Sequence, residues 1–299
     1  MAAAEHRFTY TVGAEDNQKK VSQVLTTRLG MSGQTLIRLK RSGTVENNGL
    51  PVYLKDLVRS GDRLTVVLRE ERQQDLLPEE VHLDITFEDE HLIVINKPPG
   101  MVVHPTKGYL AGTLANALVA HYAKTGQSLI VRPVHRLDRD TSGLVLWAKN
   151  PHVQAVLTAE HSSGEWQKSY LAMVTGVVQA DSGRIDAPIM RVGGGSRARV
   201  VSPEGQQAIT LWEKIAVHGD NTLQKVTLIT GRTHQVRVHM AHIGHPLVGD
   251  EVYGSFSPLI SRQALHAAWQ SFRHPVSGER ISLFVPPPAD FQALLFPTS

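Results

Sequence analysis

A twelve-residue stretch near the middle of the chain holds a dense set of side chains suited to chemistry. Residues 133–144 read PVHRLDRDTSGL, in which Asp138 and Asp140 interleave with Arg136 and Arg139, and an apolar run follows. Because an unpaired buried charge is driven to neutralise, we expect some of these carboxylates and guanidiniums to pair near a cleft. The pattern therefore predicts a polar loop that enters a strand. A solvated charged turn is the alternative that the residue types leave open.

Two further segments carry side chains that suit such a cleft. Tyr170 lies in the alternating run 166–174, which is typical of a strand. From its type alone, Tyr170 is equally well read as a half-buried strand tyrosine. Arg237 lies in the segment 230–250, TGRTHQVRVHMAHIGHPLVGD. Taken by itself, Arg237 is also consistent with a guanidinium that reaches solvent from the flank of a helix.

The segment 230–250 predicts a helix and invites a metal hypothesis. Thr233 is expected to cap the helix and Gly244 to end it, with three apolar residues on the buried side: Val236, Met240 and Ile243. Histidine is a common metal ligand, and the segment holds four histidines. No carboxylate lies within the segment at the spacing of a zinc protease, and the HExxH pattern is absent from the sequence. We therefore expect no metal site.

Length and composition bound the class of protein. The chain has 299 residues, room for two domains, and a formal charge of +3 with a pI of about 9.1. This mild positive excess permits an anionic partner. The sequence contains no cysteine, no apolar run of about 18 residues and no signal-peptide pattern at its start. These features predict a soluble, cytoplasmic protein without disulfides or membrane contact, and a monomer is the default.

The first 72 residues predict a small domain of their own. Helical spacing of apolar residues marks 21–29, and a second helix is expected after Ser32, with Leu36, Ile37 and Leu39 on its buried side. A turn at 47–49 precedes a strand at 63–68. Three basic residues are expected to be exposed on the second helix and to suit phosphate contacts, or to form a solvated face: Arg38, Lys40 and Arg41. Residues 73–84 are charged and aperiodic and predict a linker.

Residues 85–299 predict a larger second domain. Strands are expected at 91–96, 166–174, 208–217 and 222–230, and helices after Thr113 and after Asn150-Pro151. Strands outnumber helices, so the expected fold is α+β: a mixed, mostly antiparallel sheet with flanking helices. Residues 191–199 contain three arginines and three consecutive glycines. They predict a mobile loop that either touches RNA or is merely solvated.

Several of these segments resemble one known family. The run HRLDRDTSGL at 135–144 looks like the signature of the RluA-type pseudouridine synthases, and KSYLAMVTG at 168–176 and TGRTHQVRVHM at 230–240 resemble the family's second and third motifs. Further matches lie at 100–105 and 265–275, where Gln270 replaces a usual leucine. The first domain is similar to the S4 RNA-binding domain. The resemblance is close over roughly residues 84–290 and loose over the first 70.

The resemblance implies a function and roles for residues. Asp138 would be the catalytic residue, Tyr170 would line the active site, and Arg237 would pair with Asp138. Three residues would contact the RNA, with Arg136 filling the gap left by the extruded base: His135, Arg136 and Arg139. The implied reaction is the isomerisation of uridines in structured RNA, without cofactor. Ribosomal RNA is the favoured substrate and transfer RNA the alternative. A catalytically silent RNA-binding protein of the same fold and a uridine-releasing glycosidase are the competing hypotheses.

Overall fold

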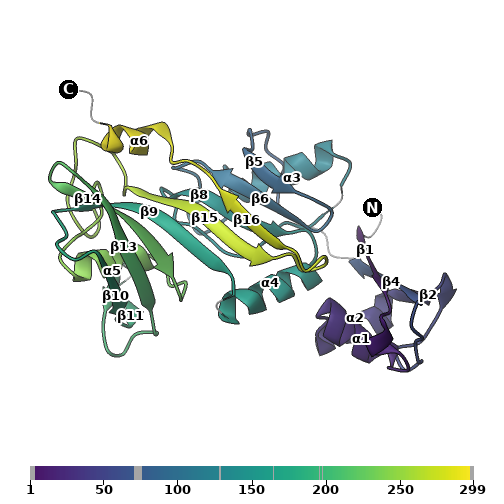
Figure 1. Ribbon diagram of the computed structural model, residues 1–299. Coiled ribbons are helices and arrows are strands. Elements are labelled where there is room, and N and C mark those ends of the chain that lie inside the picture. The colour runs from purple at the N-terminus through teal and green to yellow at the C-terminus, as the bar shows by residue number, and fades with distance from the viewer. Residues whose placement is uncertain are drawn as a thin grey trace.

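The computed structural model describes residues 4–70, 76–127, 129–163, 165–194, 196 and 198–296. Figure 1 shows the N-terminal elements as a small unit beside a large body that is built around one long sheet. The combination of a mostly antiparallel sheet with flanking helices confirms the predicted α+β class. Within the described residues, no helix is both long enough and apolar enough to cross a membrane.

The N-terminal unit combines a sheet with two α-helices. Within the described residues its strands pair in the order β1-β4-β2-β3. The elements are β1 (Ala4–Thr11), a short 3-10 helix (Ala14–Asp16), α1 (Val21–Leu29), α2 (Gly33–Ser42), β2 (Thr44–Asn47), β3 (Leu50–Pro51) and β4 (Arg63–Glu70). The prediction missed β1, which pairs along its whole length with β4.

The two predicted N-terminal helices are confirmed, with one error in packing. Ser32 caps α2, because its hydroxyl accepts the Thr35 N–H at 3.2 Å. Leu39 is buried under this helix, but Ile37 is 54% exposed, so its predicted burial is wrong. Neighbouring positions on a helix point about 100° apart, and so Ile37 leaves the narrow stripe that faces the sheet.

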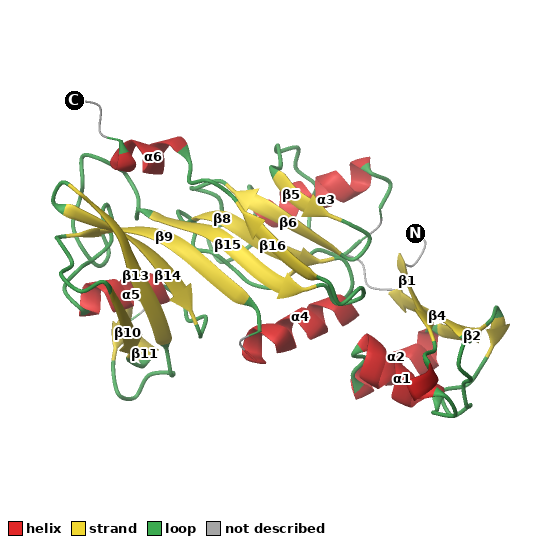
Figure 2. Cartoon of the chain, in the orientation of Figure 1, coloured by secondary structure: helices red, strands yellow, loops and turns green. Residues whose placement is uncertain are grey.

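The larger unit contains the long sheet and the remaining helices. The strands are β5 (Ile85–Glu88), β6 (Leu92–Lys97), β7 (Arg132–Pro133), β8 (Ser142–Ala148), β9 (Gln167–Thr175), β10 (Ser182–Asp186), β11 (Ile189–Arg191), β12 (Arg199–Val201), β13 (Ile209–His218), β14 (Asn221–Leu228), β15 (Leu265–Arg273) and β16 (Arg280–Phe284). The helices are α3 (Leu114–Lys124), α4 (Pro151–Ser163), α5 (Gln235–His242) and α6 (Ala289–Leu295). Figure 2 shows these helices around the sheet.

The order of strands brings distant parts of the sequence together. Within the described residues the main sheet runs β10-β13-β14-β9-β15-β8-β6-β5, with β16 on β15 and β7 on β8. Its pairs are antiparallel except that of β15 and β8, where His266 pairs with Ser142 and Ala267 with Gly143. This parallel pair sets the start of β8 in the middle of the sheet. The loop that carries Asp138 therefore enters the sheet at its centre.

Alternation along the strands divides the core into two faces. On β9, Tyr170 and Ala172 belong to the cluster that also holds Met240 of α5, whereas Leu171 belongs to the cluster that holds Phe291 of α6. Successive side chains of a strand point to opposite faces, so α5 and α6 cover opposite sides of the sheet. The α5 side is the one on which Asp138 lies.

The predicted starts of two helices are confirmed by their caps. The Thr113 hydroxyl accepts the Asn116 N–H before α3, and the Asn150 side chain accepts the Val153 N–H at 2.8 Å before α4. Thr233 does not cap α5 as predicted. His234 takes that position, with φ of 59° in the left-handed region.

Two predicted loops fall partly outside the described residues. The predicted linker, residues 73–84, is described from residue 76. There the carbonyl of Leu77 accepts from Asn116 of α3, and the Glu79 carboxylate accepts the Gly112 N–H. The arginine-rich loop connects β11 to β12, and its Gly195 and Arg197 lie outside the described residues.

Candidate active site

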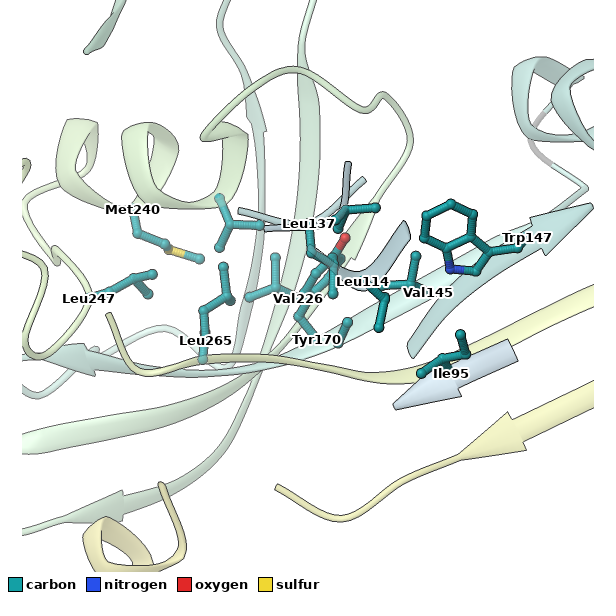
Figure 3. Packing of buried hydrophobic residues seen from close by; sticks show 14 of the residues in the cluster. Ile95, Leu114, Leu137, Val145, Trp147, Tyr170, Val226, Met240, Leu247 and Leu265 are labelled. Carbon is teal, nitrogen blue, oxygen red and sulfur yellow. The ribbon is translucent and has the colours of Figure 1, made fainter. Parts of the chain in front are cut away.

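Asp138 lies in the loop between β7 and β8, with its carboxylate within reach of solvent. The neighbouring Leu137 is buried in the core cluster drawn in Figure 3, whereas the Asp138 side chain is 25% exposed. The Asp138 carbonyl accepts the Thr141 N–H at 3.2 Å, which closes a turn just before β8. The buried leucine anchors the loop, and the adjacent carboxylate is left at the surface of the core.

Arg237 on α5 contacts two carboxylates at once. Its Nε and Nη2 donate to Asp250 at 2.7 and 2.8 Å, and its Nη1 lies 3.4 Å from Oδ2 of Asp138. Burial would lower the pKa of Arg237, but the hydrogen-bonded Asp250 and the charge of Asp138 raise it. The structure therefore brings Asp138 and Arg237 together, as the resemblance implied. It also gives Arg237 a closer partner, Asp250, whose role was not predicted.

Tyr170 lies on β9 within the same core cluster, and Figure 3 shows it beneath Leu137. It is only 6% exposed. Burial and the nearby charge of Asp138 raise the pKa of its hydroxyl. Tyr170 therefore stays protonated at neutral pH, and a phenolate that removes a proton from the base is disfavoured.

His234 and Tyr253 complete the surroundings of Asp138. Nε2 of His234 lies 3.9 Å from Oδ2 of Asp138, and its Nδ1 lies 2.7 Å from the Tyr253 hydroxyl. The guanidinium of Arg237 lies over the Tyr253 ring, 5.1 Å from its centroid. Sequence reasoning had assigned His234 no role beyond the metal hypothesis, and it had not considered Tyr253.

Two buried cations hold the backbone around Asp138. Nζ of Lys97, at the end of β6, donates to the carbonyls of Pro98, Met101 and Arg139 at 2.8–2.9 Å. Burial lowers the pKa of Lys97 to about 7. Arg262 donates to the carbonyl of Asp140 at 3.0 Å. Because these bonds reach the carbonyls of the two residues that follow Asp138, they fix the path of the loop on that side.

The arginines of the loop differ in their surroundings. Arg136 is exposed. Arg139 is exposed too, but it donates to both oxygens of Asp140 and to the Tyr109 hydroxyl at 2.7 Å. Arg139 is therefore paired within the loop, as expected for the solvated charged turn that was the alternative prediction.

The structure places His135, one of the predicted RNA contacts, largely away from solvent. Its side chain is 9% exposed, and its Nε2 lies 3.2 Å from the Leu146 N–H and 3.0 Å from the Gln270 amide. Its ring also packs edge-on against Trp166. Gln270, the departure from the family pattern, therefore has a buried polar partner where a leucine would have none.

The predicted basic residues of the N-terminal unit lie on α2, and Arg38, Lys40 and Arg41 are all exposed there. The histidines of 230–250 do not gather as ligands. His239 bonds Thr210 and the carbonyl of Ala187, and His245 bonds the carbonyl of Thr175. Among the described residues, no three side chains of His, Asp or Glu converge as a metal site would require.

Comparison with known proteins identifies the class of protein to which this site belongs. Residues 91–242 match the family model described as RNA pseudouridylate synthase. A Bacillus subtilis protein, "Uncharacterized RNA pseudouridine synthase YjbO", is 40% identical over 89% of this chain and 95% of its own length. A "Ribosomal large subunit pseudouridine synthase D" of Pseudomonas aeruginosa is 39% identical over 85% of this chain and 84% of its own. The chain is therefore an isomerase that acts on RNA.

A solved structure agrees with this class. The human protein "RNA Pseudouridylate Synthase Domain Containing 1" is 25% identical, with a TM-score of 0.56 over 69% of this chain and 84% of its own. The chain belongs to the RNA pseudouridylate synthase family. The family match includes Asp138, Tyr170 and Arg237 but ends before Asp250 and Tyr253.

Proposed function

We propose that this enzyme converts specific uridines of large-subunit ribosomal RNA to pseudouridine, with Asp138 as the catalytic residue. The observation that carries the proposal is the partly exposed carboxylate of Asp138, held 3.4 Å from the guanidinium of Arg237. The choice of RNA follows from relatives, because proteins of Pseudomonas aeruginosa and Zymomonas mobilis that are 39% and 40% identical carry the name ribosomal large subunit pseudouridine synthase D.

The reaction conserves every atom of the nucleoside. The bond between C1′ of the ribose and N1 of the uracil breaks, the base turns, and C1′ joins C5. The proton of C5 is lost and N1 gains one, so no oxidant, reductant or cofactor is consumed. The charged Asp138 either attacks the electron-poor C1′, as a glycosidase carboxylate does, or removes a proton from the sugar. Both steps need an ionised carboxylate close to the ribose.

The residues around Asp138 have supporting roles. Arg237 steadies the carboxylate and fixes its rotamer, because it is itself fixed by Asp250. Tyr170 stacks on the uracil or donates a hydrogen bond from its protonated hydroxyl. The target base must leave its stack, at a cost of a few kcal/mol. Arg136, exposed beside the catalytic loop, stacks in the gap that the base leaves.

The N-terminal unit holds the structured RNA. Residues 1–72 form an S4-like domain, residues 73–84 a linker, and residues 85–299 the catalytic domain. Arg38, Lys40 and Arg41, exposed on α2, contact phosphates of the RNA. An enzyme with such a second contact recognises a large folded substrate rather than a short single strand.

The test uses RNA from cells that lack this protein and were fed 5-tritiated uridine. The wild-type chain releases tritium from this RNA, whereas Asp138→Asn lowers release by more than about 10³-fold while RNA affinity and melting temperature are kept. Asp181→Asn, a change of a carboxylate that is 93% exposed, is the matched control and leaves release unchanged. Mapping of the new pseudouridines then identifies the RNA.

Each competing hypothesis predicts a different result. Normal tritium release by Asp138→Asn rules out Asp138 as the catalytic residue. New pseudouridines in transfer RNA alone rule out the ribosomal substrate. A glycosidase lowers the mass of the RNA by one base, whereas isomerisation leaves the mass unchanged. A catalytically silent RNA-binding protein binds the RNA and releases no tritium.

A further inference from the structure

His234 is held in an unusual backbone conformation beside the catalytic carboxylate. Its φ of 59° lies in the left-handed region, which residues with a Cβ adopt at a cost. Such strain persists only where the surrounding structure enforces it. Here the conformation directs the imidazole toward the carboxylate of Asp138, 3.9 Å away, and toward the hydroxyl of Tyr253, 2.7 Å away.

Tyr253 connects three parts of the molecule. Its hydroxyl accepts the backbone N–H of Arg199 on β12 at 2.8 Å and bonds Nδ1 of His234. Its ring packs under the guanidinium of Arg237. Burial raises the pKa of this hydroxyl, so it keeps its proton and is able to donate. Tyr253 therefore joins the β11–β12 hairpin to both groups that face Asp138.

The hydrogen-bond chemistry allows one consistent arrangement of protons. Nε2 of His234 lies 3.9 Å from Oδ2 of Asp138, which is longer than a hydrogen bond, but an N–H on this nitrogen turns the positive end of its dipole toward a carboxylate that can only accept. Burial lowers the pKa of His234, which favours the neutral ring with one proton. With that proton on Nε2, Nδ1 is an acceptor. The Tyr253 hydroxyl accepts from Arg199 and donates to Nδ1.

We propose that Tyr253 and His234 are positioning residues for Asp138, forming a chain that runs from the Arg199 N–H through the Tyr253 hydroxyl to Nε2–H of His234. The chain fixes the tautomer of His234 and turns its Nε2–H toward Oδ2 of Asp138, the same oxygen that Arg237 approaches. The inference rests on the proposed role of Asp138.

The first test removes one hydroxyl. Tyr253→Phe keeps the ring under Arg237 but removes the donor to His234. We expect kcat for tritium release to fall about tenfold, because the hydrogen bond that orients His234 beside the carboxylate is lost. KM and RNA affinity should stay within about twofold. Tyr10→Phe removes a comparable bond, 2.7 Å to Asp16 in the N-terminal unit, and should leave kcat unchanged.

The second test asks whether the two residues act together. His234→Leu should also lower kcat about tenfold or more, and His234→Gln should recover part of the loss, because its amide places an N–H near the position of Nε2. In the His234→Leu background, Tyr253→Phe should cause no further loss of kcat, since it acts through His234.

Three outcomes overturn the inference. The first is an unchanged kcat in Tyr253→Phe, and the second is losses of kcat that multiply in the double variant. The third is a rise of KM as large as the loss of kcat, because it would show that Tyr253 contacts the RNA and does not position Asp138. The RNA from cells lacking the protein serves here too, so the wild-type chain is active whichever RNA it modifies. If the enzyme modifies an RNA other than ribosomal RNA, the map of modified sites shows it. The ratios of variant to wild-type kcat are unaffected.

Discussion

A guanidinium shared between two carboxylates is the residue-scale feature on which the site depends. Arg237 is 6% exposed and Asp250 is 1% exposed. The two hydrogen bonds between them, of 2.7 and 2.8 Å, are shorter than the 3.4 Å contact between Arg237 and Asp138. A buried pair of this kind costs desolvation, and removal of one partner leaves the other charge uncompensated. Asp250 also accepts the backbone N–H groups of Val252 and Tyr253. One carboxylate thereby orders both Arg237 and the segment that carries Tyr253.

This geometry predicts that stability and activity separate in a double variant. Asp250→Asn should lower the free energy of unfolding by about 3 kcal/mol, because it leaves the Arg237 charge buried without its partner. Adding Arg237→Met should restore most of that stability, yet kcat should stay reduced by at least about 100-fold, since Asp138 has lost its cation. Thermal unfolding and tritium release measure the two effects. If the double variant recovers activity as well as stability, Arg237 contributes only to the stability of the fold and not to the reaction.

Residue types in a loop indicated part of this site. The run of charges at 135–140 and the resemblance to a family singled out Asp138, Tyr170 and Arg237, and the fold brings Asp138 and Arg237 into contact. Tyr253 bonds Arg199, 54 positions away in the sequence, and Asp250 meets Arg237 only because the chain turns back after α5. Local pattern carries no signal for such a contact. The burial of His135 was not predicted, because a polar residue type in a charged run gives no measure of burial.

At the scale of elements, the parallel pairing of β15 with β8 sets the position of the loop that carries Asp138. Gly143, at the start of β8, has φ of 111°, and a Cβ there would collide with the backbone of Ala267. Alternation predicted β9, β13 and β14, and a continuous apolar run predicted β6, but the order of the strands depends on long-range pairing. The sequence pattern therefore indicated the α+β class and not which strand would lie beside the Asp138 loop.

Gly143→Ala should accordingly damage the sheet at the active site. We expect a loss of about 3 kcal/mol in the free energy of unfolding, from the disfavoured φ and the overpacked contact, together with loss of tritium release. Gly193→Ala is the matched control, because a Cβ there meets nothing within 4 Å. It should change stability by less than about 0.5 kcal/mol. Equal melting temperatures for the two variants would contradict the proposed packing.

At the scale of the whole molecule, the two units share one hydrophobic cluster. Phe8, Val24 and Leu25 of the N-terminal unit belong to the same cluster as Leu92 and Val94 of β6. Shared burial of this kind stabilises the docking of the N-terminal unit on the larger unit. No periodicity within either segment could have predicted it, because the contact depends on how two separately folded surfaces fit. Removal of the N-terminal unit would therefore expose apolar surface as well as remove a proposed RNA contact.

A buried histidine makes this docking sensitive to acid. His152 on α4 is 2% exposed, and the edge of the Phe8 ring lies against it with centroids 5.2 Å apart. Burial lowers the pKa of His152 to about 4, and His91, close by, is also shifted downward by burial. Protonation of His152 thus places a charge inside the shared cluster.

The sign of the pH effect follows from proton binding. Between pH of about 6.5 and about 4 the unfolded chain binds a proton at His152 that the folded chain does not, so stability falls as the pH falls through this window. His152 should contribute up to about 3 kcal/mol to that loss. His152→Leu should therefore flatten the curve of unfolding free energy against pH, and hydrogen exchange in β1 and α1 should rise less on acidification than in the wild type. Burial also lowers the pKa of His266 to about 4, but this residue lies on β15 in the larger unit. His266→Leu is therefore the control: it should flatten the stability curve without reducing the rise of hydrogen exchange in β1 and α1. If His152→Leu loses stability as steeply as the wild type between these pH values, His152 does not govern the docking of the two units.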